Sequence, residues 1–158
     1  MRSSSSLLGF VSVLIISLVS AGVNWQAEAS TDPPIDSPPF TRYQVEDHIK
    51  MAESQIADIR PGLEKSIIWA GTPNRRTRYA IVYIHGFSAS KEELRPVPDL
   101  IAARLGANIF YSRLTGHGRT AEAMREATVS AWLQDLAEAF EIGTMIGDRV
   151  IILSCSTG

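Results

Sequence analysis

Ser156 is the residue of this sequence best placed to act as a nucleophile. It lies in the sequence S-x-S-x-G at 154–158, directly after an apolar run, 149–154, that is typical of a buried strand. A tight strand-to-helix turn raises one serine hydroxyl above the backbone, and small residues two positions to each side let the strand and the helix approach closely. Gly158 meets this requirement, while Ser154 stands where glycine is more usual. A serine presented in this way can attack a carbonyl carbon.

Cys155 is a weaker candidate for the same role. It occupies the variable position of the turn, where its side chain is expected to pack beside the strand. As the only cysteine, it cannot form an intramolecular disulfide. The alternative for the whole segment is a serine-rich loop without chemistry. The preceding strand and two further loops upstream argue against that alternative.

The first of these loops is His85-Gly86-Phe87, which follows an apolar strand predicted at Tyr79–Ile84. Attack on a carbonyl builds negative charge on its oxygen, and backbone N–H groups aimed at that point lower the barrier by several kcal/mol. We expect Phe87 to supply one N–H and Thr157, the residue after the nucleophile, to supply the other. Gly86 lets the backbone approach without a Cβ in the way. For His85 we expect a structural role.

The second loop is Leu114-Thr115-Gly116-His117-Gly118, whose glycines permit a sharp turn. We expect this loop to form a wall of the site and to hold the neighbouring loop. A general-base role for His117 is the alternative. All three loops follow predicted strands of one sheet, and ligands bind at the carboxyl ends of strands in such sheets.

The elements that position these loops alternate along the chain. Apolar runs predict strands at Ile67–Trp69, Tyr79–Ile84, Asn108–Tyr111 and Arg149–Ser154, and helical spacing predicts helices from Thr41 to about Arg60, at Lys91–Leu105 and at Ser130–Met145. Pro96 and Pro98 suggest that the regular part of the second helix starts only near Val97. Strand–helix alternation of this kind predicts an α/β fold with βαβ crossovers and a parallel sheet.

The first predicted helix carries signals at its beginning. Thr41 and Gln44 have the spacing of a capping box, and Phe40 and Val45 are placed to form a hydrophobic staple. We expect this helix to pack on the sheet without contributing chemistry.

The amino-terminal region predicts targeting rather than fold. Arg2, an apolar run at 7–23 and the sequence Ala27-Glu28-Ala29 are typical of a signal peptide cleaved before Ser30. We therefore expect a signal peptide at 1–29, a Pro-rich linker at 30–40 and one domain at 41–158, in a secreted or periplasmic protein. The alternative is an uncleaved segment that tethers the domain to a membrane.

Composition limits the classes of function. The chain has 158 residues, of which 45% are hydrophobic and 20% are charged, and a net charge of −2. This is globular composition, without the broad basic surface that nucleic-acid binding requires. The three histidines, at 48, 85 and 117, are far apart in sequence, so a zinc site is not expected.

Taken together, the three loops over 79–158 resemble the α/β-hydrolase superfamily, and more narrowly its bacterial esterases and lipases. The resemblance implies a partial α/β-hydrolase fold, with a mostly parallel sheet and flanking helices, truncated after the nucleophile strand. It implies Ser156 as nucleophile, and Phe87 and Thr157 as oxyanion donors. It also implies a small-molecule acyl ester as substrate, with no metal and no organic cofactor.

The order of catalytic residues in this family is serine, then acid, then histidine. No Asp, Glu or His follows Ser156 in the sequence. We therefore expect an N-terminal part of a carboxylesterase-like or lipase-like hydrolase that has little or no turnover by itself. Acyl transfer or peptide hydrolysis on the same fold, and a non-catalytic secreted binding protein, are the alternatives.

Overall fold

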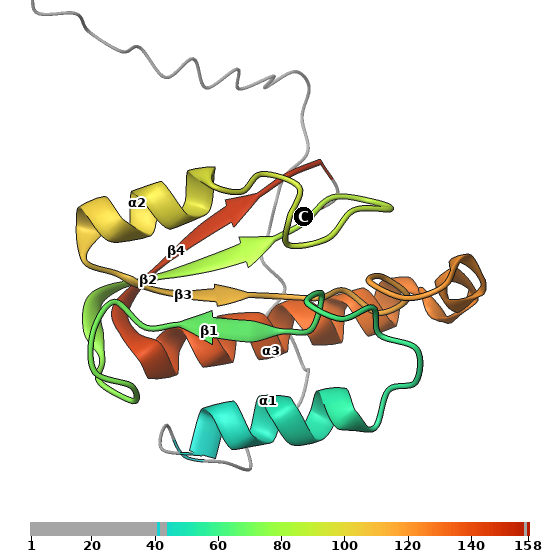
Figure 1. Ribbon diagram of the computed structural model, residues 1–158, viewed down its shortest axis with the longest axis horizontal. Helices are drawn as coiled ribbons and strands as arrows, with labels where there is room; N and C mark the ends of the chain where they lie inside the picture. The colour runs from blue at the N-terminus through green and yellow to red at the C-terminus, as the bar shows by residue number, and fades with distance from the viewer. Residues whose placement is uncertain (1–40, 42–43, 157) are drawn as a thin grey trace, which may run out of the picture. The chain divides into compact units, whose positions relative to one another are not determined.

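The structure, a computed structural model, describes residue 41, residues 44–156 and residue 158 (Figure 1). The predicted signal peptide, the linker and the Phe40 staple lie outside the described residues, as does Thr157. The elements in chain order are α1 (Val45–Ser54), β1 (Ser66–Ile68), β2 (Thr77–Ile84), α2 (Val97–Leu105), β3 (Asn108–Tyr111), the 3-10 helix η2 (Ala121–Glu126), α3 (Val129–Ile146) and β4 (Gly147–Ser154).

The four strands form one sheet in the order β1-β3-β2-β4. Strand β2 pairs in parallel with β3 on one side and with β4 on the other, and β1 pairs antiparallel with β3. The prediction of a mostly parallel α/β sheet is therefore confirmed. Because β2 is central, its carboxyl end lies between the ends of β3 and β4.

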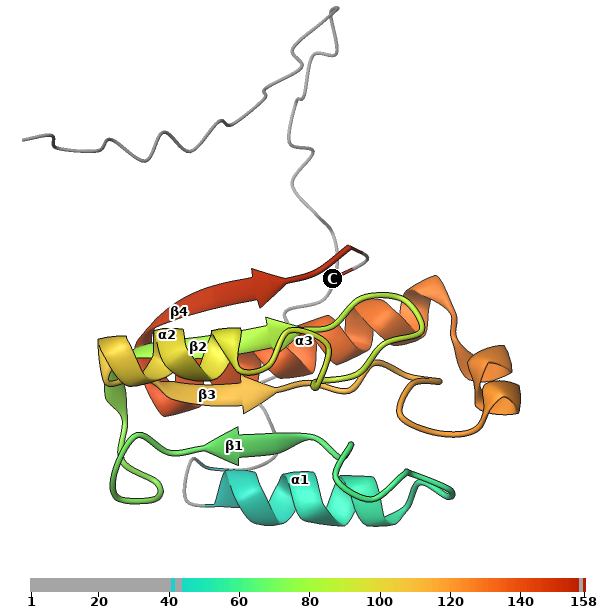
Figure 2. The ribbon, with the colours of Figure 1, turned by 45° about the horizontal axis from the view of Figure 1, so that its top comes forward.

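Helices cover both faces of the sheet, as Figure 2 shows. One core cluster joins α1 and α3 to alternate residues of β2, among them Val82 and Ile84. A second cluster joins α2 to the intervening residues Ile81 and Tyr83. This arrangement explains why the β2 sequence is apolar throughout, since its side chains alternate between two buried faces.

Helix α2 begins at Val97, which confirms the later of the two starting points suggested by the sequence. The residues from Lys91 to Pro96 form turns instead of helix. Pro98 is tolerated because it lies in the first turn, where a missing N–H removes no helical hydrogen bond.

Helix α1 is shorter than the sequence pattern predicts. It ends at Ser54, six residues before Arg60. The next two N–H groups bond three residues back, Gln55 to the Ala52 carbonyl and Ile56 to the Glu53 carbonyl, and Asp58 has a φ of 60°, which stops the helix. Of the predicted capping box, the Thr41 N–H donates to Gln44 Oε1 at 3.2 Å. The reciprocal bond from Gln44 N goes to the Thr41 backbone oxygen instead of its hydroxyl.

Candidate active site

Three loops meet at one edge of the sheet because the strands that they follow are parallel neighbours. The His85-Gly86-Phe87 loop follows β2, the Leu114–Gly118 loop follows β3, and the turn containing Ser156 follows β4. In Figure 2 these segments leave the same end of the sheet. This edge is where α/β folds bind their ligands.

The backbone at Ser156 has the geometry of a sharp turn. Its φ is 52°, in the left-handed region that non-glycine residues rarely adopt. The Cys155 N–H donates to the Ile84 carbonyl at 3.2 Å, and the Gly158 N–H donates to the Cys155 carbonyl at 3.0 Å. A Cβ on Gly158 would lie 2.7 Å from the Ile84 carbonyl oxygen, so this position requires glycine. The turn is thus packed against the end of β2.

Ser156 lies directly against the first loop. A Cβ built on Gly86 would be 3.3 Å from the Ser156 Cβ and 3.3 Å from the Cys155 carbonyl oxygen. The structure therefore brings the predicted nucleophile beside the loop that contains Phe87, although the two are 69 residues apart in sequence (156 minus 87). A side chain at Gly86 would fit only if a neighbour moved by a few tenths of an ångström.

The peptide group between Gly86 and Phe87 is held from one side. Its carbonyl oxygen accepts a hydrogen bond from His85 Nδ1 at 2.9 Å and another from the Ala89 N–H at 3.2 Å. In a trans peptide the N–H points opposite to the carbonyl. The Phe87 N–H accordingly points away from these partners, and it donates to no group among the residues that the structure describes.

Glu93 holds the peptide group between His85 and Gly86. The sequence did not predict this role. Its carboxylate accepts the Gly86 N–H at 2.9 Å, and this hydrogen bond lowers the pKa of the carboxyl group. No sequence signal marks Glu93, because the turns at 91–96 that bring it back to Gly86 were predicted as the start of a helix.

His85 and His117 are both engaged as neutral rings. His85 is fully buried, and its Nε2 accepts the Leu114 N–H at 3.1 Å. The Nε2 of His117 accepts the Ser88 N–H at 3.0 Å. Since a backbone N–H can only donate, each ring carries its proton on Nδ1. Burial lowers the pKa of His85. In this geometry each ring links two loops, as expected for a structural role, and neither Nε2 is free to accept a proton from a serine.

Aromatic side chains surround this part of the site. The ring of His117 lies 4.8 Å from that of His85, 5.7 Å from that of Trp132 and 6.1 Å from that of Phe87, measured between centroids. Phe87 is 63% exposed. Trp132 Nε1 donates to the Thr115 carbonyl at 3.0 Å, so α3 helps to hold the second loop.

Cys155 is half-buried beside Glu93. Burial and the charge of the nearby carboxylate raise the pKa of its thiol. A raised pKa keeps the sulfur protonated at neutral pH, which makes it a poor nucleophile.

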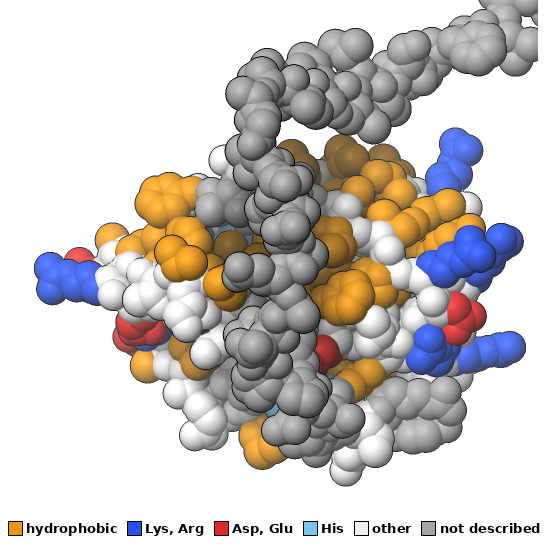
Figure 3. Space-filling model, turned by 180° about the vertical axis from the view of Figure 1, so that it is seen from behind, with side chains coloured by type: hydrophobic (Ala, Val, Ile, Leu, Met, Phe, Trp, Pro, Cys, Tyr) orange, Lys and Arg blue, Asp and Glu red, His pale blue; other side chains and the backbone are white. Residues whose placement is uncertain are grey.

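Two hollows adjoin the loops. One, of about 430 Å³, lies between the Ser88–Ala89 loop and residues 116–121. The other, of about 190 Å³, is apolar and is lined by Ile84, Leu114 and side chains of α3. Figure 3 shows hydrophobic side chains gathered on the face that lies behind the sheet in Figure 1. On α3 the exposed ones are Val129, Leu133 and Phe140.

Within the described part of the chain, no cluster of three His, Cys, Asp or Glu residues could hold a metal ion. Among these same residues, no helix has the length and apolar character needed to cross a membrane.

The fold and the arrangement of the three loops define the class: the described residues form part of an α/β-hydrolase fold. The chain is similar to a solved structure from work on LipS and LipT, two metagenome-derived lipolytic enzymes, with 27% sequence identity and a TM-score of 0.53. The match covers 63% of this chain and 38% of that one, so this chain spans well under half of the enzyme's length. No family model matches the sequence, and no curated protein does.

Proposed function

We propose that the protein hydrolyses carboxylic esters through an acyl-enzyme formed on Ser156. The observation that supports this most directly is the contact between Ser156, in its left-handed turn, and Gly86, whose following peptide has an N–H that donates to no group among the described residues. A nucleophile and an oxyanion donor must both lie within about 3 Å of the position that the reacting group occupies. The similarity to lipolytic enzymes supports the same reaction class.

In the proposed reaction, Ser156 Oγ attacks the ester carbonyl carbon and its proton passes to a base. The carbonyl oxygen becomes negatively charged and is stabilised by the N–H groups of Phe87 and Thr157. Collapse of this intermediate breaks the bond to the alcohol, which leaves with a proton. Water then hydrolyses the acyl-serine and releases the carboxylic acid.

The base is the part of this mechanism that these 158 residues do not supply. His85 and His117 each use Nε2 to accept a backbone N–H, and His48 on α1 pairs with Glu138 at 3.9 Å. No Asp, Glu or His follows Ser156 in the sequence. We therefore place the acid and the histidine in sequence outside these 158 residues, and we expect the 158-residue chain to have little turnover by itself.

A fluorophosphonate probe tests the assignment. We expect the product of the full reading frame that contains these residues to be labelled, with the adduct mapped to Ser156 and p-nitrophenyl ester hydrolysis blocked. Ser156→Ala should abolish labelling, whereas Ser154→Ala, the matched control two residues earlier, should retain it. Labelling that survives in Ser156→Ala would contradict the proposal. Rapid Ser156-dependent hydrolysis by the 158-residue chain would contradict the placement of the base.

For localisation we propose export by the segment at 1–29, which lies outside the described residues. The apolar run and the Ala27-Glu28-Ala29 sequence support cleavage before Ser30. Amino-terminal sequencing of the protein recovered from periplasm or medium should begin at Ser30. An intact Met1 on protein recovered from membranes would support the tethered alternative.

A further inference from the structure

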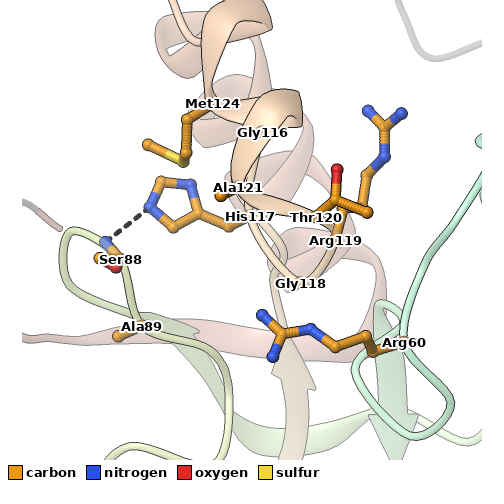
Figure 4. A pocket seen from close by; sticks show the side chains of 10 residues that line it. All are labelled: Arg60, Ser88, Ala89, Gly116, His117, Gly118, Arg119, Thr120, Ala121 and Met124. Atoms are coloured by element: carbon orange, nitrogen blue, oxygen red, sulfur yellow. Dashed lines mark hydrogen bonds between the residues drawn. The ribbon is translucent and has the colours of Figure 1, made fainter.

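The larger hollow of about 430 Å³ lies beside the proposed oxyanion peptide. Three segments form it: the chain after α1, which contributes Arg60, the loop after β2, which contributes Ser88 and Ala89, and residues 116–121 (Figure 4). Ser88 directly follows Phe87 in sequence. A group bound in this pocket would therefore lie next to the loop that carries the proposed oxyanion donor.

Among the described residues, one arginine that lines the pocket has no partner for its side chain. Figure 4 shows the Arg60 side chain extending into the space between Ala89 and Gly118. The Arg60 guanidinium makes no hydrogen bond or ion pair with any residue that the structure describes, and no Asp or Glu is among the lining residues. Arg60 is exposed, and an arginine that points into a hollow without a carboxylate can bind a negatively charged group there.

Arg119, the other arginine of the pocket, is already engaged. Its Nε donates to the Ala57 carbonyl at 2.7 Å and its Nη1 donates to Glu126 at 2.5 Å. In Figure 4 its guanidinium extends away from His117. Arg119 therefore holds the loop in place and neutralises Glu126, so of the two arginines only Arg60 has a side chain without a partner among the described residues.

The other polar groups of the pocket favour the same kind of ligand. Ser88 and Thr120 are among the lining residues, and neither hydroxyl makes a hydrogen bond within the described residues. His117 cannot act as an acceptor there, because its Nε2 already accepts the Ser88 N–H. Ala89 and Met124 add apolar wall, which suits a short hydrocarbon linker.

We infer that this pocket binds a carboxylate carried by the ester substrate, so that the preferred substrates are half-esters of short dicarboxylic acids. This inference rests on the proposed function for the ester chemistry, and on the geometry of Arg60 for the charge. The planar guanidinium would take the carboxylate through two parallel hydrogen bonds, with the Ser88 hydroxyl as a further donor. Free phosphate offers similar oxygens and is the alternative source of the same charge.

The test measures binding without turnover. The Ser156→Ala protein is titrated by calorimetry with monomethyl succinate, with dimethyl succinate as its neutral match and with inorganic phosphate. We expect monomethyl succinate to bind roughly tenfold more tightly than the diester, because a hydrogen-bonded charge adds about that factor. Arg60→Gln should remove this preference. Arg75→Gln, which deletes an exposed arginine before β2 at the opposite end of the sheet, should leave it unchanged.

Each outcome decides the inference. Equal binding of the two esters, or a preference that persists in Arg60→Gln with an unchanged circular dichroism spectrum, would overturn it. Arg60-dependent binding of phosphate without binding of monomethyl succinate would also overturn it, in favour of a free-anion site. Binding to the Ser156→Ala protein does not depend on the nucleophile. Arg60-dependent binding, combined with an absence of fluorophosphonate labelling in the protein with Ser156, would therefore contradict the proposed function and still support the anion site.

Discussion

The Ser156 Cβ lies 3.3 Å from the point that a Cβ on Gly86 would occupy. The same point is 3.1 Å from Glu93 Oε1, so three segments of the chain converge tightly on the space beside Gly86. The nucleophile turn and the oxyanion loop are therefore in direct contact, and the missing side chain at Gly86 sets how closely they approach.

Gly86→Ala should impair the site more than the fold. The added methyl group must displace the Ser156 turn, the Glu93 carboxylate or the loop itself, and a small shift of the Phe87 N–H weakens the stabilisation of negative charge. We expect the rate of fluorophosphonate labelling to fall about tenfold, which corresponds to about 1.4 kcal/mol. Unfolding free energy should fall by about 1 kcal/mol.

Gly71→Ala is the matched control for this change. A Cβ at Gly71 would have no atom within 4 Å, and the residue lies in the connection between β1 and β2. It should leave both the labelling rate and the stability close to those of the parent protein. Labelling of Gly86→Ala at the parent rate would show that the contact does not position the oxyanion peptide.

The sequence predicts the sheet well because its signals are local. Strand β3 occupies the predicted residues Asn108–Tyr111, since a short apolar run with both faces buried is evident without knowledge of its partners. The early end of α1 was not predicted, because the left-handed backbone at Asp58 gives no signal in the apolar pattern. Neither the Glu93 bond to Gly86 nor the place of Arg60 leaves a sequence signal, because both depend on how separate loops pack.

Glu53→Gln should destabilise the protein strongly. The Glu53 carboxylate accepts two hydrogen bonds of 2.8 Å from Arg113, and the two side chains are only 5% and 4% exposed. Burial raises the pKa of Glu53, but the hydrogen bonds from Arg113 and from the Lys65 N–H outweigh it, and the pKa is lowered. Removing one partner of a buried pair leaves an uncompensated charge, so we expect a loss of about 3 kcal/mol in chemical denaturation.

The surface pair of Arg76 and Asp148 provides the comparison. Its Nε and Oδ1 atoms are 3.1 Å apart, and the Asp148 side chain is 67% exposed. Asp148→Asn should cost less than about 1 kcal/mol, because exposed ion pairs contribute little. Equal losses in Glu53→Gln and Asp148→Asn would show that the Glu53–Arg113 pair does not anchor α1 to the loop after β3.

Stability should decline as the pH falls below 6.5 because of His85. Burial lowers the pKa of this ring below its ordinary value of 6.5, so the unfolded chain binds a proton that the native protein does not. The neutral His85 ring makes its full contribution to the free energy of unfolding above pH 6.5. This contribution is lost as the pH falls, by at most about 1.4 kcal/mol per pH unit. Glu53 and Glu93 have lowered pKa values and begin to lose their contributions only near pH 4.5 and below.

Urea unfolding at a series of pH values measures this slope. We expect His85→Asn to be less stable at pH 7.5, because it loses the bridge between the Gly86 carbonyl and the Leu114 N–H. Its unfolding free energy should also depend less on pH between 6.5 and 5. A parent protein with constant stability over this range would mean that His85 accepts a proton in the native state.

The left-handed backbone at Ser156 should lower the stability of the protein while it presents the hydroxyl needed for the proposed function. Its φ of 52° brings Cβ close to the following carbonyl, at a cost of roughly 1 to 2 kcal/mol for any residue except glycine. Ser156→Gly should therefore be more stable than Ser156→Ala by about 0.5 to 1 kcal/mol, after allowing for the greater freedom of glycine in the unfolded chain. Both variants lack the hydroxyl and should not be labelled.

The same two substitutions at Ser130, an exposed position of α3, should give the opposite order, with glycine less stable than alanine by about 1 kcal/mol. If glycine were the less stable residue at both positions, the fold would not be holding Ser156 in the strained conformation that presents its hydroxyl.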